Sequence, residues 1–183
     1  MFNLANKITL LRMLMTPLVV ILLYFEGPLV CILAACAFVF ASITDWMDGY
    51  IARREKIVTS LGKFLDPLAD KILICSVLIM FVELGWAPAW VVIVIVCREL
   101  VVTGLRAMAS DAGVCLAADK FGKVKTVLQI MAVVPLMLHY PVAGVAIWPL
   151  GEVLLYIALA MTVFSGVNYC YDFYSKAYRH RQL

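Results

Sequence analysis

Residues 45–70 read DWMDGYIARREKIVTSLGKFLDPLAD, and this charged stretch lies between two long apolar runs. It contains four aspartates, Asp45, Asp48, Asp66 and Asp70. Carboxylates inside or next to a membrane are costly and usually functional, because lipid does not solvate charge. Two such groups about 4 Å apart repel each other by roughly 4 kcal/mol at an effective dielectric constant of about 20. Bound cations would remove this repulsion, so the stretch predicts a divalent-cation site.

The rest of the chain is unusually apolar. Of its 183 residues, 65% are hydrophobic and 15% are charged, and the mean hydropathy is +1.01. These values exclude an ordinary soluble domain. A helix needs about 20 apolar residues to cross a bilayer, and six runs approach that length: Ile8–Phe25, Leu29–Ile51, Asp66–Val82, Pro88–Met108, Lys123–His139 and Ala146–Tyr169. We therefore expect an all-α polytopic membrane protein, one domain over residues 1–183 with a bundle of six transmembrane helices, preceded by an interfacial segment at residues 1–7.

The basic residues predict how this bundle is oriented. Lys and Arg collect in cytoplasmic loops, and here they occur at both chain ends and around the second and fourth connections, whereas the other three connections have none. Both termini and the aspartates are thus expected to face the cytoplasm, with the protein in the inner cell membrane. The net charge of +3 suits anionic lipid head groups, so we expect membrane lipids as partners and no nucleic acid.

Helical spacing groups the small and acidic residues of the charged stretch. Residues at i, i+3, i+4 and i+7 share one helix face. This spacing occurs twice, first at Asp45, Asp48, Gly49 and Ala52, and again at Gly62, Asp66, Ala69 and Asp70. Oxygen ligands favour Mg²⁺ or Mn²⁺ over zinc, and a metal pair suits phosphoryl chemistry. Because Arg53 adds a planar donor for phosphate, the pattern predicts phosphoryl transfer at the membrane edge.

Each aspartate taken alone also fits a purely structural role. Asp66 precedes Pro67 and suits the cap of a helix that begins at the proline. Asp45 and Asp48 suit surface ion pairs with the arginines that follow them. The joint spacing of all four carboxylates, with the glycines and Arg53, favours the metal site.

At these residues the chain resembles the CDP-alcohol phosphatidyltransferase family, whose signature is D-x2-D-G-x2-A-R-x8-G-x3-D-x3-D. It matches all eight fixed positions. The resemblance implies a six-helix membrane enzyme, commonly a homodimer, that binds two divalent ions, Mg²⁺ or Mn²⁺. Such enzymes transfer a phosphatidyl group from a CDP-linked lipid to an alcohol and release CMP. Carried over by position, the metal ligands are Asp45, Asp48, Asp66 and Asp70, with Asp70 also the catalytic base, and the CDP site comprises Asp48, Gly49, Ala52, Arg53 and Gly62.

Other segments of the sequence narrow the choice of acceptor alcohol. Five short segments resemble the bacterial members of the family, which join sn-glycerol 3-phosphate to CDP-diacylglycerol and give phosphatidylglycerophosphate. These segments are Thr44-Asp45-Trp46, Arg98-Glu99 and residues 6–12, 64–71 and 122–126. A phosphorylated acceptor requires cations. Arg98 and Arg106 are eight residues apart, about 12 Å along one helix face at roughly 1.5 Å per residue. The predicted acceptor-phosphate pocket consists of Arg98, Arg106, Lys123 and Lys125.

These basic residues also have simpler interpretations. Arg98 suits a local ion pair with Glu99, and Lys123 and Lys125 suit anchoring at the inner membrane surface. The acceptor pocket is therefore a weaker prediction than the aspartate site.

Three other functions fit part of the pattern. A divalent-cation transporter would also use carboxylates, but its site usually lies near the membrane midplane. A prenyl-diphosphate enzyme uses aspartates and magnesium with a tighter Asp spacing. A sibling enzyme that accepts inositol phosphate, serine or phosphatidylglycerol fits the signature equally well.

Overall fold

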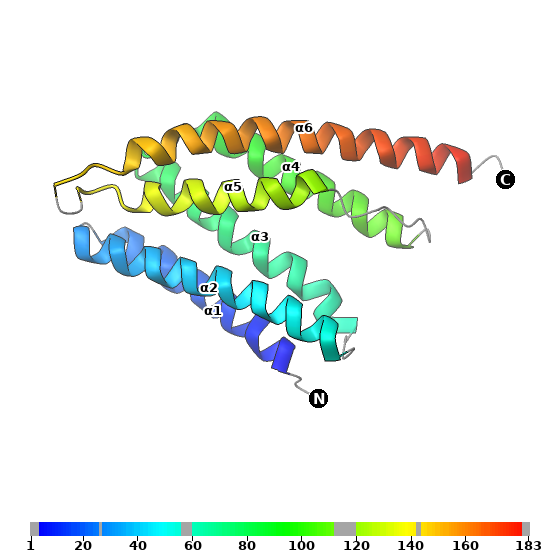
Figure 1. Cartoon of the computed structure of the whole chain (residues 1–183), viewed down its shortest axis with the longest axis horizontal. Coiled ribbons are helices and arrows are strands. Elements are labelled where there is room, and N and C mark those ends of the chain that lie inside the picture. Colours follow the sequence, from blue (N-terminus) through cyan, green and yellow to red (C-terminus); the bar gives the residue numbers. More distant parts are fainter. Residues whose placement is uncertain (1–3, 26, 56–59, 112–119, 142–143, 181–183) are drawn as a thin grey trace.

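The computed structural model describes residues 4–25, 27–55, 60–111, 120–141 and 144–180 (Figure 1). Within these ranges the chain is all-helical and has no strand, as the apolar runs predicted. Its helices are α1 (Leu4–Tyr24), α2 (Pro28–Glu55), α3 (Ser60–Glu83), α4 (Ala89–Asp111), α5 (Lys120–Met137) and α6 (Trp148–His180).

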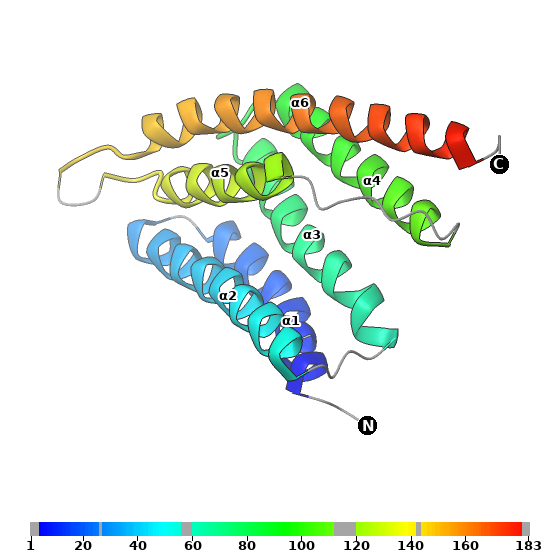
Figure 2. The same cartoon turned by 45° about the vertical axis from the view of Figure 1, so that its right-hand side comes forward.

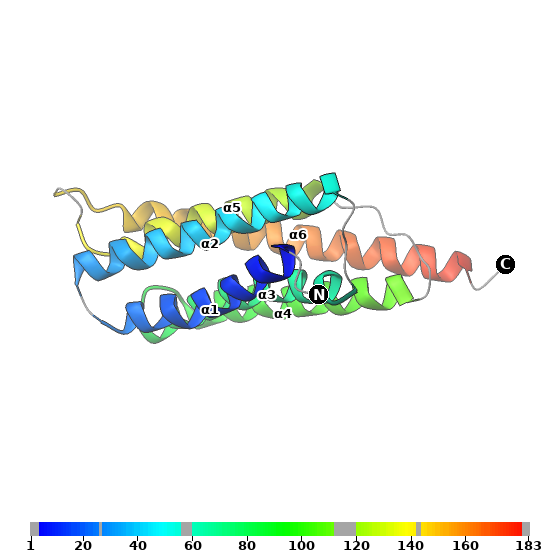
Figure 3. The same ribbon diagram turned by 90° about the horizontal axis from the view of Figure 1, so that it is seen from below.

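Successive helices run in opposite directions (Figures 1 and 3). The starts of α1, α3 and α5 and the ends of α2, α4 and α6 therefore lie toward one end of the bundle, which we call the charged end. The opposite helix termini form what we call the far end. The aspartate motif spans the last turns of α2 and the first turns of α3, so it belongs to the charged end.

The main helix contacts form a closed ring. Passing around it, α1 packs against α3, α3 against α4, α4 against α6, α6 against α5, α5 against α2 and α2 against α1, with α5 and α6 in the most extensive contact. Figure 2 shows α1 and α2 together on one side and α5 and α6 together on the other. One consequence is that both aspartate-bearing helices, α2 and α3, pack against α1.

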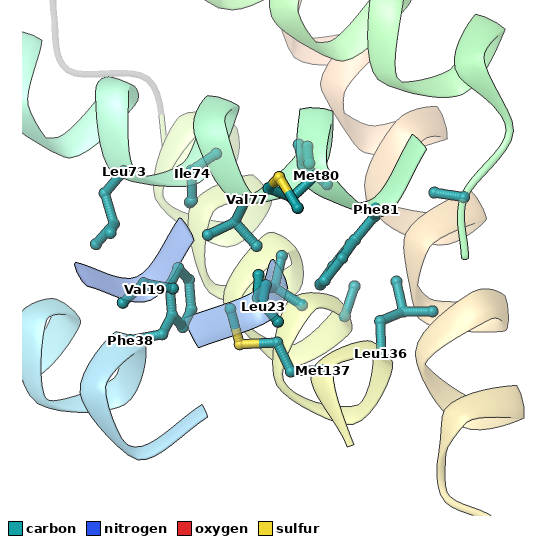
Figure 4. Packing of buried hydrophobic residues seen from close by; sticks show 14 of the residues in the cluster. Val19, Leu23, Phe38, Leu73, Ile74, Val77, Met80, Phe81, Leu136 and Met137 are labelled. Carbon is teal, nitrogen blue, oxygen red and sulfur yellow. The ribbon is translucent and has the colours of Figure 1, made fainter. Parts of the chain in front are cut away.

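The apolar core lies toward the far end of the bundle (Figure 4). It contains Leu23 of α1, Phe38 of α2, Phe81 of α3 and the adjoining Leu136 and Met137 of α5. Close packing of such side chains stabilises the bundle, because each buried apolar side chain makes many favourable dispersion contacts with its neighbours. The far half is thus held by dispersion contacts between well-fitted side chains.

Each helix also carries large apolar side chains on its outer surface, among them Leu14, Leu29, Ile79, Leu100, Val127 and Phe164. A water-soluble monomer rarely exposes large apolar side chains on every helix. By length and composition, among the described residues, one helical stretch suffices to cross a bilayer, Trp148–Ser175. Shorter apolar helical stretches cover Leu10–Tyr24, Pro28–Thr44 and Val124–Met137.

The turn after α3 is fixed by a glycine. Gly85 has a φ of 71°, a left-handed conformation that other residues adopt only with strain. Its N–H donates to the Val82 carbonyl at 3.1 Å, and the Trp86 N–H donates to the Phe81 carbonyl at 2.7 Å. The Phe81 and Trp86 rings lie 5.7 Å apart between centroids, which completes a Schellman cap with its apolar contact. The break predicted at Gly85 therefore has a specific geometry.

The largest differences from the helix boundaries predicted from the apolar runs lie at the start of α3 and at the end of α6. α3 begins at Ser60, so Asp66 lies inside the helix and its alternative role as the helix cap is wrong. α6 continues to His180 instead of stopping at Tyr169. Backbone hydrogen bonding extends through polar residues beyond any apolar stretch, which is why hydropathy underestimated both helices. Of the expected interfacial segment, residues 1–3 lie outside the described residues, and Leu4 already belongs to α1.

Candidate active site

The aspartate motif is carried by continuous helix on both sides of the connection between α2 and α3. α2 holds Asp45, Asp48, Gly49, Ala52 and Arg53, and α3 holds Gly62, Asp66 and Asp70. Their backbone is described, whereas their side chains lie outside the described part of the structure. The helical spacing on which the predicted stripes depend is therefore present along both segments.

The motif positions extend the inward faces of their helices. On α2, the buried Phe38 and Ala41 are followed at helical spacing by positions 45 and 48. On α3, position 70 lies three and seven residues before the buried Leu73 and Val77. The stripes that form the core at the far end thus lead, at the charged end, to the carboxylate positions.

Covalent geometry limits how far apart these two helix ends are. Glu55 ends α2 and Ser60 begins α3, and five residue steps span at most about 18 Å at roughly 3.6 Å each. The donor set is made of carboxylate oxygens, with no His or Cys in the motif. Such a set fits a hard divalent cation. Among the side chains that the structure describes, no other group of His, Cys, Asp or Glu gathers as a metal site.

A buried arginine lies on the helix that contacts both aspartate helices. Arg12 of α1 is 2% exposed, and Thr16 donates its hydroxyl to the Arg12 carbonyl at 3.2 Å. A guanidinium at such depth is expensive unless negative charge compensates it. Sequence reasoning used Arg12 to orient the protein in the membrane and as part of the segment at residues 6–12 that resembles the bacterial enzymes, but gave it no place in the site. The signal that it offered was a single Arg inside the first predicted span, Ile8–Phe25.

A second buried polar group, which we call the Glu99 cluster, joins α3, α4, α5 and α6. Its members are Lys71, Arg98, Glu99, Lys125 and Ser165. The Glu99 carboxylate forms ion pairs with Lys125 Nζ and, at 3.3 Å, with Arg98 Nη1. Arg98 Nη2 donates to Ser165 Oγ at 2.7 Å. Two cations from different helices thus meet at one carboxylate oxygen.

The main-chain carbonyl of Glu99 extends this cluster to α3. It accepts hydrogen bonds from Lys71 Nζ at 3.4 Å and from Thr103 Oγ1 at 2.6 Å. Lys71 is the residue after Asp70. The cluster is therefore connected to the helix that carries the predicted base.

The cluster is shielded from solvent. The Glu99 and Lys125 side chains are each 5% exposed, and that of Arg98 is 12% exposed. Two basic side chains, Arg98 and Lys125, pair with the Glu99 carboxylate, and Lys71 donates to the Glu99 carbonyl. These ion pairs therefore lie in a dry setting, where electrostatic attraction is strongest.

The four residues predicted to bind the acceptor phosphate are placed differently. Arg98 and Lys125 meet at Glu99, so the local Arg98–Glu99 pair expected as an alternative is present. Arg106 is exposed, and its guanidinium carbon lies 5.8 Å from the centroid of the Tyr169 ring, a cation–π contact. Lys123 lies on α5, and its side chain is outside the described residues. Sequence reasoning missed Lys71 and Ser165, because nothing in a single sequence pairs them with α4.

Comparison with known proteins agrees with the motif. The model of the family "CDP-alcohol phosphatidyltransferase" matches residues 2–164. The chain is 44% identical over 181 residues to the CDP-diacylglycerol–glycerol-3-phosphate 3-phosphatidyltransferase of Bacillus subtilis (strain 168), covering 92% of this chain and 94% of that protein.

Two further relatives are similar over most of this chain. The protein of the same name from Rickettsia bellii (strain RML369-C) is 38% identical, with 91% of this chain and 93% of that protein covered. The "Probable phosphatidylglycerophosphate synthase" of Mycobacterium tuberculosis (strain ATCC 25618 / H37Rv) is 39% identical, with 91% and 79% covered. The resemblance inferred from the eight signature positions is thus confirmed, and the chain belongs to the CDP-alcohol phosphatidyltransferase family.

Proposed function

We propose that this protein transfers the phosphatidyl group of CDP-diacylglycerol to sn-glycerol 3-phosphate, giving phosphatidylglycerophosphate and CMP for phospholipid biosynthesis. The observation that carries the proposal is the 44% identity, over nine tenths of the chain, to a protein named for this reaction. The complete signature on α2 and α3 supports the same chemistry.

The residue roles follow the motif. Asp45, Asp48, Asp66 and Asp70 hold two divalent cations, Mg²⁺ or Mn²⁺, which when bound offset the charge of the diphosphate and of the leaving CMP. Gly49, Ala52, Arg53 and Gly62, with Asp48, line the CDP site, where small residues leave space for the nucleotide. The inward stripes of α2 and α3 support this placement.

Asp70 is the proposed base. The acceptor hydroxyl forms a new P–O bond to the phosphatidyl phosphorus, the P–O bond to CMP breaks, and the hydroxyl proton passes to the Asp70 carboxylate. Lys71, next to this aspartate, bonds the Glu99 carbonyl, so α3 and α4 are connected beside the base.

Arg98, Arg106, Lys123 and Lys125 bind the phosphate of the acceptor. The burial of Arg98 and Lys125 in the Glu99 cluster supports this role, because both cations are held away from water. Replacing Arg106 by Ala is expected to raise the KM for glycerol 3-phosphate more than the KM for the lipid. Equal changes in both values would count against the pocket.

The six helices cross the inner membrane, with both termini and the active site on the cytoplasmic side, and the enzyme works as a homodimer. Lys and Arg at alternate connections support this orientation, and the exposed apolar side chains on every helix support contact with lipid. A site at the charged end is accessible to a lipid substrate from the bilayer and to a soluble acceptor from the cytoplasm, which suits the two substrates.

A CMP-release assay tests the proposal. Purified protein is supplied with CDP-diacylglycerol, Mg²⁺ and one of four acceptors: glycerol 3-phosphate, serine, inositol phosphate or phosphatidylglycerol. We expect turnover with glycerol 3-phosphate and its loss when the metal is chelated. Preferred turnover of another acceptor would refute the acceptor assignment, and release of no CMP with any acceptor would refute the reaction class.

A further inference from the structure

Glu99 is a buried acidic residue to which the proposed reaction assigns no task. It is 4% exposed and lies in the middle of α4. Its carboxylate holds Lys125 of α5 and Arg98 of its own helix, and its carbonyl accepts from Lys71 of α3. A single residue thus ties together three helices at the proposed acceptor pocket.

The position of Arg98 is fixed from α6 as well. Ser165 Oγ lies 2.7 Å from Arg98 Nη2. The adjacent Gly166 leaves the space that the arginine occupies, because a Cβ at this position would lie 2.9 Å from Arg98 Cγ and 3.2 Å from Nε. The guanidinium is therefore held between a carboxylate on one side and a hydroxyl on the other.

One hydrogen-bond donor of Arg98 remains unused. Its Nε is buried and has no hydrogen-bond partner among the described residues. Leaving a buried donor unsatisfied is unfavourable, and a ligand oxygen would satisfy it. This guanidinium is thus held by its terminal nitrogens, and its Nε has no partner among the described residues.

A carboxylate beside an anion pocket repels the anion. A role for the Glu99 carboxylate at this pocket therefore requires a benefit that outweighs the repulsion. Lys and Arg have long flexible stems that extend toward water unless they are held. Fixing both cations before the acceptor arrives provides such a benefit, because the ordering cost is then met during folding.

We propose that Glu99 is a positioning residue for the acceptor phosphate. Its carboxylate sets Arg98 and Lys125 in place, Ser165 fixes the other side of Arg98, and the Glu99 carbonyl ties this arrangement to α3 next to Asp70. The inference rests on the proposed function, since it assumes a phosphorylated acceptor.

The Glu99→Gln variant separates positioning from simple electrostatics, because the two predict opposite changes. Loss of the negative charge alone would lower the KM for glycerol 3-phosphate. Loss of positioning raises it, roughly tenfold for one weakened charge-assisted hydrogen bond, while the KM for CDP-diacylglycerol stays within about twofold. Inhibition by inorganic phosphate, competing with glycerol 3-phosphate, should weaken in parallel. An unchanged or lower KM for glycerol 3-phosphate, or an equal rise in both KM values, overturns the proposal.

Two further variants complete the experiment. Glu83→Gln is the matched control, because Glu83 is exposed at the last residue of α3, and both KM values should stay at the wild-type level. If Glu99→Gln fails to fold, as judged by size-exclusion chromatography and thermal melting, Ser165→Ala decides. It should raise the KM for glycerol 3-phosphate about threefold by removing a single hydrogen bond, and an unchanged value overturns the proposal.

The wild-type protein in the same assay separates the two levels of inference. If it releases CMP with glycerol 3-phosphate but Glu99→Gln lacks the expected split in KM, only the positioning role fails. If the wild type does not use glycerol 3-phosphate, the proposed function fails, and the role of Glu99 fails with it.

Discussion

The two halves of the bundle are held together by different forces. Toward the far end, Phe38, Phe81 and Leu136 pack in an apolar core (Figure 4). From the middle of the bundle toward the charged end, the buried residues include Arg12, Glu99 and Lys125. Buried ion pairs seldom stabilise a fold more than apolar residues of equal size would. The far half thus secures the fold by apolar packing, whereas the buried charges need a reason other than stability, which the proposed reaction provides for Glu99 and Lys125.

The largest effect is expected from Asp70→Asn at the charged end. Amide and carboxylate have nearly the same shape, so the helix is retained, but the amide does not accept the hydroxyl proton. We expect CMP release to fall by about 10²–10⁴-fold, the usual contribution of a general base, with little change in Tm. Asp172→Asn, at an exposed position of α6, is the matched control. Near-normal turnover by Asp70→Asn would remove Asp70 as the base.

The Arg12→Leu variant tests whether the buried guanidinium of Arg12 is compensated by a negatively charged partner. Removal of one partner from a buried pair costs about 3–5 kcal/mol, because the other charge is left without compensation. We expect a large drop in Tm in detergent together with loss of activity, and partial recovery in Arg12→Lys. A Leu variant as stable as wild type would mean that Arg12 has no such partner to lose.

At the far end, Gly151→Val should act on stability alone. A Cβ at this position would lie 2.7 Å from the Leu136 nitrogen and 3.0 Å from the Ala132 carbonyl oxygen, so α5 and α6 would have to separate. Overpacking of this kind costs about 1–3 kcal/mol, and we expect a lower Tm with unchanged KM values for the folded protein.

Gly104→Ala is the matched control for that prediction. Gly104 is also helical, but a Cβ there meets nothing within 4 Å. Alanine favours helix over glycine by about 1 kcal/mol, so Tm should stay constant or rise. A similar fall in Tm for both variants would show that close packing at Gly151 is not the cause.

The smallest expected effect is a change in Tm with pH that arises from His139 and the Trp86 ring on which it stacks, at the far end. His139 lies just beyond α5 and stacks on Trp86 with ring centroids 4.5 Å apart, and burial lowers the pKa of His139. Because the folded protein disfavours the imidazolium, stability is complete above the ordinary histidine pKa of about 6.5 and declines as the pH falls below it. We expect a slightly lower Tm at pH 5.5 than at pH 7.5.

His139→Phe provides the control for the pH effect, since it keeps an aromatic ring and removes the titrating group. The difference in Tm between the two pH values should shrink in this variant. An equal difference in wild type and variant would assign the effect to other groups.

Much of the fold was predictable from local signals. Apolar runs gave the number and order of the helices, and Gly85 followed by Pro88 marked the turn after α3. The aspartate motif was recognisable because its meaning depends on spacing along the helix. Hydropathy did not reveal that α3 begins at Ser60, because helices continue through polar residues.

The Glu99 cluster was predictable only in part. Arg98 and Glu99 are neighbours in the sequence, so their ion pair was a natural expectation. Lys125, Lys71 and Ser165 come from three other helices. Contacts of this kind depend on which helices are neighbours and on how each helix is rotated about its axis. The periodic pattern of apolar residues in a single sequence does not contain that information.

The proposal on which the function depends most is that carboxylates from α2 and α3 act together on a pair of divalent ions. Its most direct test is the stoichiometry of Mn²⁺ bound to the purified protein with CDP-diacylglycerol, measured by electron paramagnetic resonance for the wild type, Asp45→Asn and Asp66→Asn. We expect a coupled ion pair in the wild type that is weakened by either substitution, since each removes a ligand from a different helix. Wild-type protein that binds no Mn²⁺, or a pair lost through the substitution on one helix and untouched by the other, would contradict it.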